Sequence, residues 1–190
     1  MTPLGWALVA LALLLLAVVF SYNRFVRQRT LVDESWGGID VELSRRHDLI
    51  PNLVETVEGY ATHEREVLEL LVRAREAAAA HRDDQPGLRE GFEDSVTRAL
   101  QQVLARVEAY PDLKASAGFL SLQRELTLTE DRIAAARRFY NGNVRAYNTR
   151  VRTFPSNLVA ATFRFRPRDF FELSDAAAPR ASGPGAGPAG

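Results

Sequence analysis

The chain has 190 residues, with 24 basic side chains, 24 acidic side chains, three histidines and no cysteine. This length suits one domain with a hydrophobic core and an appendage. The zero net charge disfavours a nucleic-acid-binding protein, and the lack of cysteine excludes disulfides, redox pairs, thiolate zinc sites and cysteine nucleophiles.

The first 23 residues carry no charged side chain, and the segment from Leu4 to Phe20 is almost entirely apolar. A helix of this length crosses a hydrocarbon core of about 30 Å. A cleaved signal peptide would have a basic residue before the apolar run and a small-residue cleavage site after it. The chain has neither, so residues 1–23 are predicted to be a retained transmembrane anchor.

Three arginines, Arg24, Arg27 and Arg29, follow the apolar run directly. Because basic residues stay on the cytoplasmic side of a membrane, they predict an external N-terminus and a cytoplasmic body on the inner membrane. The same side chains are candidates for contact with anionic headgroups.

Residues 31–81 show apolar residues at steps of three and four, which predicts an amphipathic helix interrupted by Pro51. Two structures fit. The apolar stripe keeps its phase across Pro51, which favours a continuous, kinked helix. Proline also suits a first helical turn, which favours a break between two antiparallel helices.

Two further helices are predicted downstream. Residues 82–86 form a polar break, and an apolar stripe then runs from Leu88 through Phe92 to Tyr110. Pro111 ends this stripe, and Asp112 is the expected cap of the next helix. A long helix with heptad-like spacing follows and stops at residues 154–157. No stretch of the body alternates as a strand would, so the predicted fold class is all-α.

The C-terminal part of the chain holds phenylalanines among arginines, and the candidates for membrane contact are Phe163, Phe165, Phe170 and Phe171. One interpretation is a cap packed on the end of the bundle. The other is an interfacial segment in the headgroup layer, which is favoured if the body makes four passes. Residues 173–190 are rich in alanine, glycine and proline and are predicted to be a disordered tail.

Motifs that carry chemistry are missing from the sequence. The residues three positions before the histidines do not make the Glu-x-x-His pattern of a di-iron bundle, and no phosphate-binding loop or nucleophile motif is present. The sequence therefore predicts no catalytic residue, no cofactor and no metal site, and a protein that is not an enzyme.

Two polar segments inside the helices need an explanation. The first contains Arg45, Arg46, Asp48, Pro51 and Asn52, and the second contains Tyr140, Asn141, Tyr147 and Asn148. Asparagine is a poor helix former, and a buried asparagine fixes register and partner choice. These residues are predicted to have structural or interaction roles, with Asn141 and Asn148 satisfying the carbonyls freed by Pro51.

From about residue 4 to residue 172 the chain resembles the LemA family of bacterial single-pass membrane proteins. The resemblance rests on VDE at 32–34, Trp36, Ile39, RRHDLIPNLV at 45–54, GY at 59–60, HE at 63–64, AAARRFYN at 134–141, YN at 147–148 and FPSN at 154–157. It implies an antiparallel, up-and-down bundle of four helical segments in residues 24–172 with a cytoplasmic body, and it favours a break at Pro51. It supplies no catalytic residues.

These observations predict a membrane-anchored scaffold whose partner is an unknown protein or a second copy of the chain. The alternative is a membrane-surface module that binds or shapes lipid. It depends on the arginines after the anchor and on the phenylalanines of residues 163–171.

Overall fold

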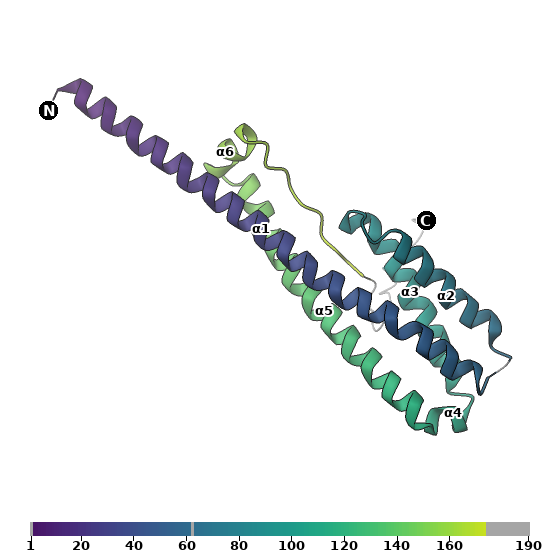
Figure 1. The fold of residues 1–190 in the computed structure, drawn as a ribbon. Coiled ribbons are helices and arrows are strands. Elements are labelled where there is room, and N and C mark those ends of the chain that lie inside the picture. Colours follow the sequence, from purple (N-terminus) through teal and green to yellow (C-terminus); the bar gives the residue numbers. More distant parts are fainter. Residues whose placement is uncertain (1, 62, 174–190) are drawn as a thin grey trace, which may run out of the picture.

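The structure is a computed structural model that describes residues 2–61 and 63–173. The described residues form six helices and no strand, which confirms the all-α prediction (Figure 1). The helices are α1 (Pro3–Glu58), α2 (Arg65–Ala80), α3 (Pro86–Val107), α4 (Pro111–Ala115), α5 (Ala117–Arg152) and α6 (Ser156–Thr162).

Helix α1 contains both the apolar anchor and the first helix of the bundle. Its 56 residues give a length of about 84 Å. The anchor part is long and apolar enough to span a membrane, and its apolar window is not covered by the rest of the chain. Figure 1 shows this part extending alone beyond the bundle.

Pro51 lies inside α1 and does not end it. The break at Pro51 favoured by the family resemblance is therefore wrong, and the continuous helix favoured by the phase of the apolar stripe is correct across Pro51 but only as far as Glu58. The reason is the direction of the proline ring: Pro51 is exposed, whereas Ile50 and Leu53 beside it are buried. The chain reverses only after Glu58, between α1 and α2.

The bundle has four long helical segments, as expected. Helices α2 and α3 form a hairpin over the far part of α1 and α5, and α5 runs antiparallel to α1 back toward the anchor (Figure 1). Ser116 caps α5, because its hydroxyl oxygen accepts a hydrogen bond from the Phe119 amide at 3.3 Å. Asp112, the expected cap, lies instead in the first turn of α4.

After α6 the chain turns back and runs extended along the bundle. We call residues 165–173 the strap. The α2–α3 hairpin covers only the half of the α1–α5 pair that is far from the anchor. In the half nearer the anchor, the strap packs against α1 and α5 in its place (Figure 1). The predicted disordered tail lies outside the described residues except for Leu173.

The buried apolar residues form two clusters along the rod. The far cluster joins α1, α2 and α3 to the start of α5 and includes Ile50, Leu71, Val103 and Leu126. The near cluster joins α1 and α5 to α6 and the strap, and its members are Phe25, Val32, Ile39, Leu43, Ile133, Tyr140, Val144, Tyr147, Ala160 and Phe171. Along α1, buried Arg46 and His47 separate the two clusters.

Candidate functional site

The two asparagines of α5 hold the strap through paired hydrogen bonds. The Asn148 amide donates to the Arg168 carbonyl and its oxygen accepts from the Arg168 amide, both at 2.8 Å. Asn141 binds Phe171 in the same way, at 2.9 and 3.0 Å. Each side chain thus replaces the neighbouring strand that an extended backbone needs.

This arrangement corrects the sequence-based hypothesis for Asn141 and Asn148. Their amide groups bind the backbone of the strap and do not satisfy carbonyls near Pro51. They nevertheless share one face of α5, because they are seven residues apart. That shared face is what lets both of them reach a single extended segment.

Aromatic side chains complete the contact between the strap and the bundle. Phe171 is fully buried and meets the Trp36 ring edge-on, with centroids 5.1 Å apart. The buried Tyr140 hydroxyl donates to the Asp169 carbonyl at 2.8 Å. Burial raises the pKa of Tyr140 to about 12, so this phenol stays protonated and remains a donor at neutral pH.

A buried ionic cluster lies between the two apolar clusters. Arg46 is fully buried and donates to Glu93 at 2.6 Å and to Glu130 at 3.0 Å. The His47 ring lies 3.1 Å from the same carboxylate of Glu93. Arg89, which is also buried, reaches Asp40 at 2.8 Å. The cluster therefore ties α1, α3 and α5 together.

Glu93 stands at the centre of this cluster. Burial alone would raise the pKa of Glu93, but the hydrogen bond with His47 and the positive charge of Arg46 outweigh it and hold the pKa below 4.5. Its second carboxylate oxygen has no hydrogen-bond partner among the described residues, although the Arg89 guanidinium lies 3.6 Å away. Glu93 is therefore ionised at neutral pH.

The sequence-based reasoning missed Glu93 and Arg89. The predicted stripe of this helix began with Leu88 and Phe92, but Leu88 is 66% exposed and Phe92 is only half-buried. Arg89 and Glu93 lie in register with buried Val96, at steps of four and three. Charged residues that continue an apolar register are the signal that could have revealed them.

The other residues of the first polar segment do not join this site. Arg45, Asp48, Pro51 and Asn52 are all exposed on α1. Only Arg46 of the residues predicted there has a buried role. The interaction roles expected for the four exposed residues stay predictions.

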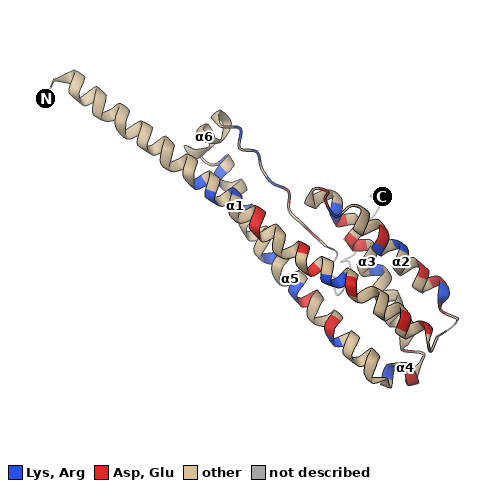
Figure 2. Ribbon diagram, in the orientation of Figure 1, with Lys and Arg blue, Asp and Glu red and all other residues tan. Residues whose placement is uncertain are grey.

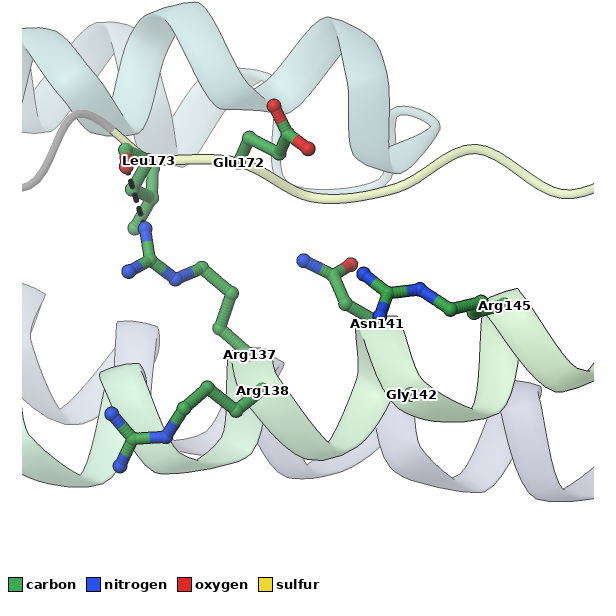
Figure 3. Close-up of a pocket in the computed structure, with 7 residues that line it drawn as sticks. All are labelled: Arg137, Arg138, Asn141, Gly142, Arg145, Glu172 and Leu173. Atoms are coloured by element: carbon green, nitrogen blue, oxygen red, sulfur yellow. Dashed lines mark hydrogen bonds between the residues drawn. The ribbon is translucent and has the colours of Figure 1, made fainter.

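An open cavity of about 500 Å³ lies beside the strap, between α5 and the end of the described chain (Figure 3). Figure 3 shows Arg137 reaching across it to the Leu173 carbonyl, at 2.5 Å, while Arg138 points away and Arg145 extends beside Asn141. Glu172 also lines the cavity. Arg137 thus binds the strap, whereas Arg138 and Arg145 are exposed to solvent.

A metal site is not found in the part of the chain that the structure describes. There, no group of three or more histidine, aspartate or glutamate side chains could hold a metal ion. The Glu93 carboxylate is surrounded by two arginines and a histidine, as expected for a buried charge that stabilises the packing of helices. The site supports packing and orientation of the strap and helices.

The candidate membrane-contact residues are separated by the fold. Phe163 lies against Tyr22, with ring centroids 4.9 Å apart, and Phe165 is half-buried. Phe171 is wrong as a membrane contact because it is buried against Trp36. Trp36 is about 24 Å beyond Phe20 along α1. Phe171 and its neighbour Phe170 therefore lie far from the end of the anchor.

Comparison with known proteins identifies the family of the chain. The sequence model of the LemA family matches residues 35–182, which cover most of the bundle. The chain belongs to the LemA family. As a LemA-type protein with one apolar N-terminal helix, it is anchored to a membrane.

Similar proteins include Protein LemA of Metamycoplasma hominis, 27% identical over 80% of this chain and 69% of that protein. Magnetosome protein MamQ 2 of Paramagnetospirillum magneticum is 23% identical over 82% of this chain and 66% of its own length. Magnetosome protein MamQ of Magnetospirillum gryphiswaldense is 21% identical over 88% and 71%. The chain therefore spans about two thirds of the length of these relatives.

Proposed function

We propose that this member of the LemA family is a membrane-tethered scaffold that holds a protein-binding face of its bundle in a fixed position relative to the membrane. The observation that carries the proposal is the unbroken α1, which joins the membrane anchor to the bundle without a linker. A helix bends only gently over such lengths. Contact with α5 along the bundle stiffens it further.

The interaction face that we propose lies on the exposed side of α1, around Gly37, Gly38 and Val41. Val41 is 65% exposed. A Cβ atom on either glycine would meet nothing within 4 Å, so packing within the described chain does not require glycine there. Glycine in a helix interior costs about 0.5–1 kcal/mol relative to alanine, and close approach of a partner helix would explain it.

In-cell photocrosslinking from position 41 tests this proposal. Replacing Val41 with a photoreactive residue should give one discrete adduct, and its mass distinguishes a second copy of the chain from another protein. Adding Gly38→Leu should abolish the adduct, because the larger side chain blocks close approach.

Gly91 provides the matched control. It lies exposed on α3, and a Cβ there also meets nothing within 4 Å. Gly91→Leu should therefore leave the adduct unchanged. An adduct that survives Gly38→Leu, or equal loss in both variants, would contradict the proposed face.

We also propose that the bundle lies in the cytoplasm, next to the inner membrane. The support is the set of arginines after the anchor, Arg24, Arg27 and Arg29, all of them exposed, because basic residues favour the cytoplasmic side. Because the chain has no cysteine, a single Leu128→Cys variant can be probed with a membrane-impermeant maleimide. We expect labelling only after cell lysis, and labelling of intact cells would invert the orientation.

A further inference from the structure

The end of the bundle beside the anchor carries an exposed apolar surface. Three large side chains on α6 and on the turns that flank it form this surface. Phe154 is 74% exposed, Leu158 is 59% exposed and Phe163 is 46% exposed. We call these three residues the membrane seat.

Aromatic contacts fix the position of the membrane seat along α1. The Phe163 ring lies 4.9 Å from the Tyr22 ring, and Phe165 stacks on Phe25 at 4.8 Å. Tyr22 is two residues beyond Phe20, the last residue of the apolar run, which is about 3 Å along the helix axis. Helix α6 thus packs against α1 close to the end of the apolar run (Figure 1).

The charge around the membrane seat is entirely positive. Residues 1–32 and 132–168 contain no aspartate or glutamate, and Figure 2 shows blue without red around α6. Exposed arginines surround the seat, namely Arg24, Arg27, Arg152, Arg164 and Arg166. Burial and the charge of Arg24 lower the pKa of Arg150, whose guanidinium lies 5.7 Å from the Phe25 ring.

We propose that the membrane seat inserts into the headgroup layer of an anionic bilayer, so that the bundle contacts the membrane at α6 as well as through its anchor. Apolar side chains ringed by arginine are typical of elements that lie in the interface, and arginine near the surface attracts anionic lipid. We infer that a bilayer, and not another protein, covers these side chains, because the membrane seat adjoins the anchor that already enters the membrane.

This inference keeps Phe163 from the phenylalanines expected from the sequence and changes the others. The strap carries Phe170 and Phe171 away from the membrane, toward Trp36. Phe154 and Leu158, which the sequence did not single out, take their place. A contact at α6 would also fix the rotation of the bundle about its anchor, and it does not depend on whether α1 binds a partner.

Depth-dependent quenching tests the membrane seat in the full-length chain. A single cysteine at Leu158 is labelled with an environment-sensitive fluorophore in vesicles of phosphatidylcholine and phosphatidylglycerol. Leu128→Cys is the matched control, because Leu128 on α5 is 55% exposed, close to the 59% of Leu158. We expect lipids with a quencher near the headgroup to quench the label at position 158 several-fold more strongly than the label at position 128.

Two results would overturn the proposal. One is equal and weak lipid quenching at positions 158 and 128. The other is a label at position 158 that is shielded from water-soluble quencher yet untouched by lipid quencher, since a second copy of the chain would then cover the seat. A Phe154→Cys label should repeat the behaviour of position 158, so failure of one variant to fold leaves the test intact.

Discussion

At the scale of single residues, the strap depends on side chains that stand in for a neighbouring strand. Asn148 alone satisfies both backbone groups of Arg168. The sequence showed that Asn141 and Asn148 were unusual, but it could not show their partners. These partners lie 20 and 30 residues further along the chain, in a segment without a regular pattern.

Replacing Asn148 with leucine should loosen the strap. The change leaves the Arg168 amide and carbonyl without partners, which costs about 1–3 kcal/mol. Thermal unfolding should shift accordingly, and trypsin should cleave faster after Arg168. Asn52→Leu on the exposed side of α1 is the control. An unchanged cleavage rate in Asn148→Leu would show that the strap is held by other contacts.

Arg46 tests the buried ionic cluster directly. Arg46→Met removes a positive charge that pairs with the buried Glu93 carboxylate. Removing one partner of a buried ion pair lowers the free energy of unfolding by about 3–5 kcal/mol. Arg45→Met, at the neighbouring exposed position, should change the free energy of unfolding by less than about 0.5 kcal/mol. Equal effects in chemical denaturation would mean that the charge of Arg46 is not needed in the core.

Glu93 should make the stability depend on acid pH. Its pKa is lower in the folded chain than the ordinary value of 4.5, so its contribution is complete above that value and is lost as the pH falls through the folded pKa. The wild-type chain should therefore lose more stability on acidification below about pH 4.5 than Glu93→Gln does. Parallel pH profiles of unfolding would contradict this assignment, and Glu76→Gln at an exposed position controls for net charge.

At the scale of elements, apolar periodicity predicted where the helices lie but not always which face is buried. The stripe of α1 was correct through Pro51, because proline on the exposed face leaves the buried residues in phase. The start of α3 was assigned one residue out of register, because Leu88 and Phe92 outweighed Arg89 and Glu93 in a search for apolar residues. The structure shows that the charged side is the buried one, as the register of Arg89 and Glu93 with Val96 could have indicated.

Pro51 should be replaceable without loss of the fold. A proline within a helix removes a hydrogen bond and costs up to about 3 kcal/mol, so Pro51→Ala should raise the free energy of unfolding by about 1–3 kcal/mol. Pro86→Ala, at the start of α3, should bring no such gain because proline suits that position. A destabilised Pro51→Ala would show that the bundle requires a bend at this residue.

At the scale of the whole molecule, the anchor, the bundle and the strap form one rod. The sequence predicted an anchor and a bundle as separate units joined near Asn23, because charge appears abruptly there. The structure joins them in a single helix and brings α6 back beside the end of the anchor. The charges also differ along the rod, because the acidic residues lie in the part of the bundle away from the anchor (Figure 2).

The measurement that tests this continuity most directly is the distance between two spin labels across the junction of anchor and bundle. Val19→Cys and Val41→Cys place labels at exposed positions on either side of it, in a chain that has no other cysteine. One unbroken helix predicts a narrow distribution near about 33 Å in lipid vesicles. A broad or markedly shorter distribution would show a hinge between the anchor and the bundle and would contradict the rigid scaffold.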